Sequence, residues 1–421
     1  MTAIHGRARL SRGMLGVLAA ASALPLLAWA DPAAAATYTV ERVLMDGLAN
    51  PRGLTVGPDG TIWVAEAGEG GEGPSIVLGD GVTNYYGATG VLTRYSGGVQ
   101  ETVADGLPSL APEGGFGASG IHDIAFGSDG TLYALFGFGT DPTLRGTLSG
   151  ESGAELFGQL TAWNGTSFVP VADLAAFEQA ENPDGADLNS NPWGLAANGG
   201  GFVVTDAGGN TVLTVAGDGT IETLAALPET ANPLPFGPPF YQAVPTGVAL
   251  GEDGEALVVQ LTGFPFVEGA ANVFSVGTDG SVGTVAGGFT NLIDVAFGED
   301  GTIFALELDS DSLTGPEMIG SLYAIDDLGI RTLLITGLIN PTSLALGPDG
   351  TIYVTENGLS PELGRVLELA PIPLPPALPM MAAGIALLVL ARRAAPRRIE
   401  RTVYGRRRHA PSRAALRVRR I

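Results

Sequence analysis

One short segment recurs six times along the chain, and this repetition constrains the fold more than any other feature. The first copy reads Asn50-Pro-Arg-Gly-Leu-Thr-Val-Gly-Pro-Asp-Gly-Thr-Ile-Trp-Val64, and the sixth, Asn340-Pro-Thr-Ser-Leu-Ala-Leu-Gly-Pro-Asp-Gly-Thr-Ile-Tyr-Val354, matches it closely. The copies begin at Asn50, Gly120, Asn191, Val244, Asn291 and Asn340, at spacings of 70, 71, 53, 47 and 49 residues. Repeats of this length indicate one small unit that buries its apolar face only by stacking against its neighbours.

Each copy contains two short apolar runs rich in β-branched and aromatic residues. In five copies an Asp-Gly pair joins the runs, at positions 59, 129, 253, 300 and 349. This pair favours tight hairpins because both residues tolerate a positive φ. After the third copy, residues 211–226 add two strands around a second Asp-Gly turn, so a unit holds four strands. The sequence therefore predicts an all-β, six-bladed β-propeller of four-stranded antiparallel blades, with insertions in the first two blades.

The sixth unit contains only three predicted strands, near residues 342–346, 351–355 and 365–369. The segment Val43-Leu-Met-Asp-Gly-Leu-Ala-Asn-Pro51 parallels Leu333-Leu-Ile-Thr-Gly-Leu-Ile-Asn-Pro341, which is the outer strand of the fifth unit. We therefore expect the N-terminal strand near Val43 to pair with the last blade. Such pairing leaves no open sheet edge, and it favours a closed ring over an open solenoid.

Charge is segregated along the chain. All 21 basic residues are Arg; 12 of them lie between Arg392 and Arg420 and three lie in the first 12 positions. Positions 37–370 carry 42 acidic residues against six Arg, a net charge of −36. A surface of this sign repels phosphate backbones, so we predict no nucleic-acid binding. The surface is either a solvated coat that maintains solubility or a cation-binding surface. The chain has no Cys, which excludes disulfides and thiol redox chemistry.

The N-terminal segment has the layout of a secretory signal peptide. Three Arg precede an apolar run from Met14 to Ala30, and the small residues at 28–30 or 34–36 suit signal peptidase. A transmembrane anchor is the alternative. We predict a signal peptide over 1–36, a mature propeller over 37–370, and export to the periplasm, the cell surface or an extracellular matrix.

The C-terminal segment carries Pro371-Ile-Pro-Leu-Pro-Pro-Ala-Leu-Pro379, then an apolar stretch over 380–391 and an Arg pair. This layout resembles the PEP-CTERM class of bacterial sorting signals. The resemblance implies a sorting signal over 371–393 whose transmembrane helix anchors the chain transiently in the inner membrane. It also implies cleavage by an exosortase-type membrane protease and delivery to the cell surface or an exopolysaccharide matrix. The Arg-rich tail, 394–421, is expected to be disordered, and a nucleic-acid-binding arm is the rival interpretation of Arg406 to Arg420.

In a propeller the first strand of each blade lines the central channel. The position just before its apolar run should therefore form a ring around the axis, at Gly53, Asp123, Gly194, Gly247, Asp294 and Ser343. Six blades place Asp123 opposite Asp294, and His122 lies beside the former in the sequence. We take Asp123, Asp294, His122 and Ser343 as candidates for binding a polar ligand or, for the two carboxylates, Ca²⁺, which prefers several oxygen ligands. The alternative is that each carboxylate accepts hydrogen bonds from backbone N–H groups at a strand start.

A second acidic set ends the second strand of four units, at Glu66, Asp206, Glu307 and Glu356. Recurrence at equivalent places predicts a turn or capping role rather than catalysis. His122 is the only His of the mature domain, and no Gly-x-Ser-x-Gly elbow lies nearby. A Ser-His-Asp triad is therefore not expected, and no catalytic residue is assigned.

Five stretches carry a family resemblance: Gly120-Ile-His-Asp-Ile-Ala-Phe126, Val203-Val-Thr-Asp-Ala-Gly-Gly-Asn210, Gln242-Ala-Val-Pro-Thr-Gly-Val248, Gln260-Leu-Thr-Gly-Phe-Pro-Phe266 and Gly288-Phe-Thr-Asn-Leu-Ile-Asp294. Together they resemble the ScyD/ScyE family of secreted proteins. The stretch Gln260–Phe266 is the most specific, because the repeat pattern alone does not produce it. The resemblance implies an exported propeller with NHL-like repeats and brings no established catalytic residue; the namesakes are encoded with the pathway of the pigment scytonemin.

Two classes of function remain open. The favoured one is a non-catalytic binding protein of the bacterial surface or matrix, which takes an exopolysaccharide, a small extracellular metabolite such as a pigment precursor, or another exported protein. The alternative is a Ca²⁺-dependent hydrolase similar to gluconolactonase-type propellers, which need a channel Glu, Asn and Asp around one metal. The ring offers Asp123 and Asp294 but mostly Gly elsewhere, so the enzyme is the runner-up.

Overall fold

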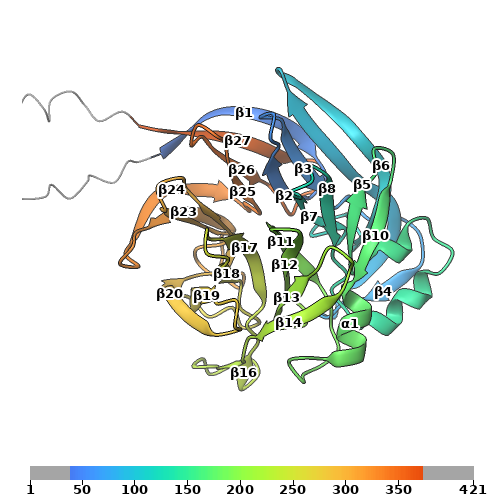
Figure 1. The fold of residues 1–421 in the computed structure, drawn as a ribbon. Helices are drawn as coiled ribbons and strands as arrows, with labels where there is room; N and C mark the ends of the chain where they lie inside the picture. The colour runs from blue at the N-terminus through green and yellow to red at the C-terminus, as the bar shows by residue number, and fades with distance from the viewer. Residues whose placement is uncertain (1–37, 373–421) are drawn as a thin grey trace, which may run out of the picture. The chain divides into compact units, whose positions relative to one another are not determined.

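The computed structural model describes residues 38–372, which form six blades around a central axis (Figure 1). The predicted signal peptide, the Arg-rich tail and the predicted sorting signal beyond residue 372 lie outside the described residues. Within 38–372 no helix is long and apolar enough to span a membrane. The predicted membrane segment, 380–391, is not part of that range.

Each blade is an antiparallel sheet with four main strands, as predicted from the repeat. The strands of each blade are given from the axis outward. Blade one contains β2 (Pro51–Val56), β3 (Ile62–Glu66), β5 (Thr83–Ser96) and β6 (Val99–Ala111). Blade two contains β7 (Ile121–Phe126), β8 (Leu132–Phe136), β9 (Gln159–Trp163) and β10 (Phe168–Asp173), and blade three contains β11 (Pro192–Asn198), β12 (Gly201–Asp206), β13 (Thr211–Val215) and β14 (Ile221–Ala226). Blade four contains β17 (Pro245–Leu250), β18 (Ala256–Gln260), β19 (Ala271–Val276) and β20 (Val282–Phe289). Blade five contains β21 (Leu292–Phe297), β22 (Ile303–Glu307), β23 (Ile319–Ile325) and β24 (Arg331–Ile339). Blade six contains β25 (Leu344–Leu346), β26 (Ile352–Glu356), β27 (Gly364–Pro371) and β1 (Tyr38–Leu48).

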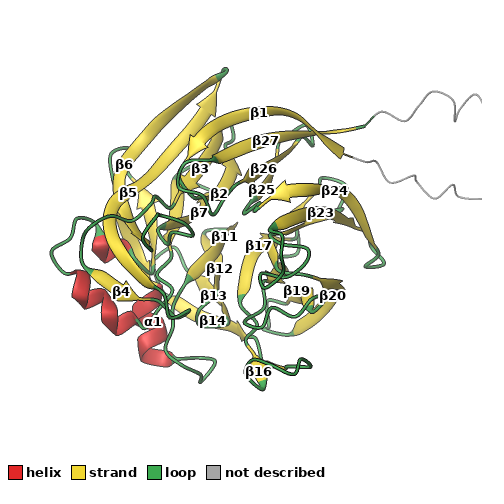
Figure 2. Ribbon diagram, turned by 180° about the vertical axis from the view of Figure 1, so that it is seen from behind, coloured by secondary structure: helices red, strands yellow, loops and turns green. Residues whose placement is uncertain are grey.

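The predicted insertions of the first two blades are present. Blade one adds β4 (Ser75–Val77) at the edge of β5, and blade two adds two 3₁₀ helices, η1 (Pro142–Leu148) and η2 (Ala154–Leu156), and the helix α1 (Leu174–Glu181). Figure 2 shows the helices together at one side of the propeller. Between blades three and four lies a small hairpin of β15 (Thr230–Ala231) and β16 (Phe240–Tyr241).

The Asp-Gly pairs form the tight hairpins that the sequence predicts, although only the glycine of each pair has a positive φ. In the first, the Asp59 carboxylate accepts a hydrogen bond from the Thr61 N–H at 3.0 Å, and Gly60 has a φ of 79°. This bond holds the pKa of Asp59 below its ordinary value. The same contact recurs at Asp129, Asp218, Asp253, Asp279, Asp300 and Asp349.

The ring closes through the N-terminal strand, as expected. β1 pairs antiparallel with β27, with Val43 opposite Leu367. The inward side chains of β1, Met45 and Leu48, are 1% exposed and pack in one cluster with Leu54 of blade one. The first and last parts of the propeller are therefore joined by both backbone pairing and apolar packing.

Candidate functional site

The inner strands approach one another closely at the predicted ring positions. A Cβ atom added to Gly53 would lie 2.6 Å from the Asp123 Cα, and one added to Gly247 would lie 2.5 Å from the Asp294 Cα. No side chain fits at such distances, so glycine is required by the close contact of neighbouring blades.

Asp123 connects blade two to blade three. Its Oδ1 accepts a hydrogen bond from the Ile124 N–H at 2.8 Å, and its Oδ2 accepts one from the Leu195 N–H at 2.7 Å. Desolvation deep in the ring, followed by the negative charge of Asp294, raises the pKa of Asp123 well above its ordinary value. The carboxyl therefore holds its proton more readily than a surface Asp.

Asp294 connects blade five to blade six in the same way. Its Oδ1 accepts a hydrogen bond from the Val295 N–H at 2.8 Å, and its Oδ2 accepts bonds from the Leu344 N–H at 2.8 Å and the Ser343 hydroxyl at 2.7 Å. The Ser343 Oγ also accepts a bond from the Leu54 N–H at 3.1 Å, which continues the connection to blade one. Desolvation raises the pKa of Asp294 to about 6.

Both oxygens of each ring carboxylate thus accept backbone hydrogen bonds. This arrangement matches the alternative for Asp123 and Asp294, in which each carboxylate accepts hydrogen bonds from backbone N–H groups at a strand start. One bond of each carboxylate also reaches the next blade, which the sequence did not predict. Among residues 38–372 no group of three or more His, Asp or Glu side chains is arranged to hold a metal ion. A cation at the ring would have to compete with the four backbone N–H groups for these oxygens.

The second acidic set has the capping role that its recurrence predicts. Each member accepts a hydrogen bond from a backbone N–H that precedes the first strand of its own blade: Glu66 from Ala49, Asp206 from Asn191, Glu307 from Thr290 and Glu356 from Ile339. These carboxylates fix the entry of the chain into the blade.

A cavity of about 650 Å³ opens where the inner strands begin. We call it the mouth pocket. All six blades contribute to its lining, with Arg52, His122, Trp193, Thr262, Ile293 and Leu359 as one example from each. A pocket lined by every blade lies on the propeller axis. Of the residues predicted for the channel, His122 lines this pocket, whereas Asp123, Asp294 and Ser343 do not.

His122 lines the mouth pocket and has an unused acceptor. Its Nδ1 lies 3.1 Å from the Pro192 carbonyl oxygen, which can only accept, so Nδ1 carries the proton and Nε2 keeps its lone pair. Nε2 is buried and has no partner within 38–372. Burial, followed by the positive charge of Arg52, lowers the pKa of His122 to about 3, so the ring is neutral near pH 7.

Arg52 and Trp193 complete a group around His122. The Arg52 guanidinium donates from Nη2 to the Ala118 carbonyl oxygen at 2.7 Å, and its Cζ lies 5.6 Å from the centre of the Trp193 ring. The His122 and Trp193 ring centres are 4.6 Å apart. Desolvation lowers the pKa of Arg52 to about 10, so the side chain remains a cation at neutral pH.

The part of the lining that blade four contributes has a strained backbone. Ten non-glycine residues in the described range have a positive φ, and six of them are Asn, which tolerates this conformation. The other four are Val244, Thr262, Phe266 and Ser312, at φ between 52° and 78°. The first three line the mouth pocket, and the Ser312 hydroxyl donates a hydrogen bond to the Phe266 carbonyl oxygen. Strain of this kind concentrates where a particular geometry is needed.

Sequence reasoning missed Arg52 and Trp193, although the repeat contains a signal for them. They occupy the same repeat position as His122, one residue before the ring position, and this position varies: Arg52, His122, Trp193, Thr246, Ile293 and Thr342. In blades one, two and five the residue here is the extra residue of a β-bulge. Pro51 and Gly53 pair with Glu66 and Ala65, Ile121 and Asp123 with Phe136 and Leu135, and Leu292 and Asp294 with Glu307 and Leu306. A bulge re-aims a side chain away from the regular alternation of the strand.

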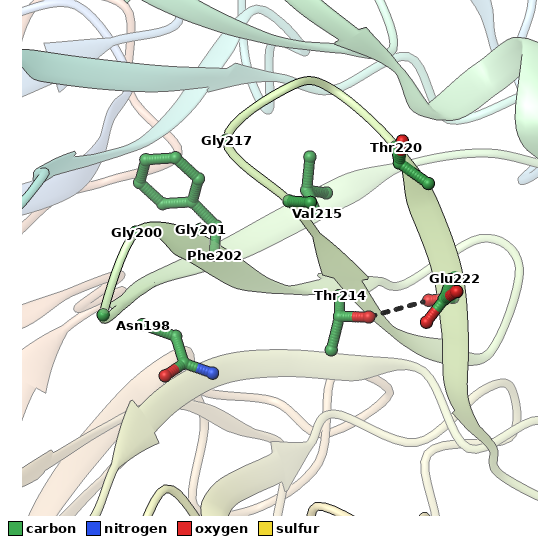
Figure 3. A pocket seen from close by; sticks show the side chains of 11 residues that line it. Asn198, Gly200, Gly201, Phe202, Thr214, Val215, Gly217, Thr220 and Glu222 are labelled. Carbon is green, nitrogen blue, oxygen red and sulfur yellow. Dashed lines mark hydrogen bonds between the residues drawn. The ribbon is translucent and has the colours of Figure 1, made fainter.

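A second concavity, of about 370 Å³, lies at the other end of blade three (Figure 3). The turns β11–β12 and β13–β14 form it, and glycines at 199–201 and 217 make up much of its lining. Its polar contact is a hydrogen bond of 3.4 Å from the Thr214 hydroxyl to the Glu222 carbonyl oxygen. This surface pocket lacks the buried, unpartnered groups that distinguish the mouth pocket.

Comparisons with known proteins yield similar folds and no family. No protein-family model matches the chain, and no curated protein does. Similar solved structures include virginiamycin B lyase from Staphylococcus aureus (13% identity, 80% of this chain and 99% of that chain, TM-score 0.43). They also include a gluconolactonase from Xanthomonas campestris (12% identity, 77% of this chain and 88% of that chain, TM-score 0.48). A third is the WD40 β-propeller domain of Doa1 (12% identity, 78% of this chain and 96% of that chain, TM-score 0.43). Identities this low do not transfer an activity to this chain.

Proposed function

We propose that this protein is an exported β-propeller that binds a small extracellular molecule in the mouth pocket without transforming it. The observation that carries the proposal is that His122 lines a pocket on the propeller axis and that its buried Nε2 has no partner in the described chain. A buried polar atom without a hydrogen bond costs about 1–3 kcal/mol, and a bound ligand that donates to it would recover this energy.

The resemblance to ScyD/ScyE proteins points to the same place. The stretch Gln260–Phe266, its most specific part, forms one wall of the mouth pocket through Leu261, Thr262, Gly263, Phe264 and Phe266. Export by a signal peptide over 1–36, sorting by an exosortase-type protease and delivery to a surface or exopolysaccharide matrix accompany this proposal. They are inferred from the terminal sequence patterns alone.

The Ca²⁺-dependent hydrolase is less well supported by the geometry. Such an enzyme needs carboxylates that are free to bind a metal, whereas the oxygens of Asp123 and Asp294 accept backbone hydrogen bonds. Removing them from these N–H donors would leave the donors unpaired within the ring.

A wall variant tests the binding site. Phe264 lines the mouth pocket and is 48% exposed, while Phe236 is 50% exposed, lies 6.3 Å away between ring centres and does not line the pocket. We expect Phe264→Ala to weaken binding of small aromatic acids or sugars, measured by calorimetric titration, at least about tenfold, and Phe236→Ala to leave it near the wild-type value. Equal effects of the two substitutions would place binding elsewhere.

Metal analysis tests the alternative. We expect the purified protein, dialysed against Ca²⁺-free buffer and then supplied with Ca²⁺, to hold less than one equivalent at the ring and to hydrolyse neither gluconolactone nor p-nitrophenyl acetate above background. Stoichiometric Ca²⁺ together with turnover, both lost in the Asp123→Asn/Asp294→Asn double variant, would show the protein to be a hydrolase.

A further inference from the structure

Arg52 is a buried cation without a carboxylate partner in a strongly acidic domain. Four of the six Arg within 37–370 form ion pairs with Asp or Glu: Arg42 with Glu368, Arg94 with Glu101, Arg145 with Asp173 and Arg365 with Glu356. Arg52 is 5% exposed and forms none within residues 38–372. With 42 acidic residues in the domain, a structural partner would be easy to provide. A buried charge is costly unless it is paired, so the missing partner is expected to arrive with a ligand.

The Arg52 guanidinium also has N–H donors that make no hydrogen bond within residues 38–372. Its Nε and Nη2 both donate to the Ala118 carbonyl oxygen, at 3.2 and 2.7 Å, whereas Nη1 has no acceptor within the described part of the chain. Arg52 lines the mouth pocket, so an anion there can receive charge-assisted hydrogen bonds.

His122 requires a hydrogen-bond donor from the ligand, whereas Arg52 requires an acceptor. Its Nε2 lone pair accepts a hydrogen bond, so the ligand must bring an O–H or N–H donor as well as an anionic group. Because Arg52 and His122 both contact Trp193, the two polar groups of the ligand must lie on one compact molecule.

Aromatic side chains provide the rest of the wall. Phe240 and Phe264 line the mouth pocket and are 51% and 48% exposed, so their faces are available for stacking by a planar body. Two further lining residues, Asp80 and Glu229, are exposed acids. They disfavour an extended polyanion at the rim, whereas water screens their effect on a small monoanion that reaches Arg52.

We infer that the mouth pocket binds a small aromatic carboxylate that also carries a hydroxyl donor, with the carboxylate on Arg52 and the hydroxyl on His122 Nε2. This inference rests on the proposed binding function and narrows it to one ligand class. Neutral sugars, which lack the charge that Arg52 requires, are excluded as the preferred ligand.

Calorimetric titration of the purified protein with hydroxybenzoates tests the inference. The probes are the 2-, 3- and 4-hydroxybenzoate isomers, each compared with its neutral hydroxybenzamide, with benzoate, which lacks the donor, and with glucose. We expect the best hydroxybenzoate to bind at least tenfold more tightly than its amide and more tightly than benzoate. Arg52→Gln should abolish the preference for the acid over the amide. Arg331→Gln, which removes an exposed Arg without an ion pair in the described range, should keep it.

The outcomes separate the two proposals. If the amide or glucose binds wild type as tightly as the acid does, and Phe264→Ala weakens that binding, the ligand class is wrong and the binding function stands. If no probe binds and Phe264→Ala changes nothing, both proposals fail. If Arg52→Gln does not fold, as judged by circular dichroism, the ratio of the dissociation constants of the amide and the acid for the wild type still tests the ligand class.

Discussion

At the scale of single residues, one position in the repeat separates structure from function. In blades four and six it holds Thr246 and Thr342, whose hydroxyls donate to the carbonyl oxygens of Leu292 and Pro51 in the next blade. In blades one to three it holds Arg52, His122 and Trp193, which line the mouth pocket. The same backbone site therefore stabilises the ring in some blades and supplies the candidate binding group in others.

Because His122 is buried as a neutral ring, the folded protein loses stability as the pH falls. Its pKa is about 3 in the folded protein against an ordinary 6.5, so below pH 6.5 the unfolded chain takes up a proton that the folded chain does not. Stability is thereby lost as the pH falls, by up to about 1.4 kcal/mol per pH unit. We expect the free energy of unfolding of His122→Gln, measured in urea, to fall by about 2 kcal/mol less than that of wild type between pH 7 and pH 5. Identical pH dependence would mean that His122 titrates normally.

At the scale of elements, the inner strands are positioned by small residues and carboxylates rather than by large side chains. Gly53 and Gly247 permit close contact with the blades that carry Asp123 and Asp294, and those carboxylates then reach the following blade. The sequence pattern identified the ring positions correctly, because the repeat aligns them. It left open whether the carboxylates bind a ligand or accept hydrogen bonds from backbone N–H groups, since both uses place Asp at a strand start.

Glycine at the ring is expected to be irreplaceable. Gly53→Ala would place a Cβ 2.6 Å from the Asp123 Cα, and such overpacking costs at least about 1–3 kcal/mol. Gly146→Ala is the matched control, because no heavy atom lies within 4 Å of its added Cβ; it should change stability by less than about 1 kcal/mol. Urea unfolding of the two variants beside wild type measures the difference, and equal costs would contradict the close contact.

At the scale of the whole molecule, stability depends on closing the ring. β1 and β27 are separated by most of the chain and meet as neighbouring strands of blade six. The pairing was predictable because the segment around Val43 repeats the sequence of an outer strand. The side chains that seal it, Met45 and Leu48, followed from the same alignment only as members of a strand and not as core residues.

Substitutions on the two faces of β1 test this closure. Met45 is 1% exposed and packs against the cluster shared with blade one, so Met45→Ala should lower the free energy of unfolding by about 2–5 kcal/mol. Val43 is 46% exposed, and Val43→Ala should change it by no more than about 0.5 kcal/mol. Thermal unfolding followed by circular dichroism distinguishes the two; a mild effect at Met45 would mean that the ring is held without this strand.

Patterns in the linear sequence were enough to predict the number of blades, the Asp-Gly hairpins, the capping carboxylates and the closing strand. Each of these depends on local turn chemistry or on a repeated position, and repetition makes such positions visible in a linear pattern. The mouth pocket, in contrast, forms only when the blades assemble into the ring. Arg52, His122 and Trp193 are about 70 residues apart, and they meet because the ring brings equivalent positions together. The bulges at Arg52 and His122 turn these side chains away from the regular alternation of the strand, and a pattern of alternating residues does not reveal that turn.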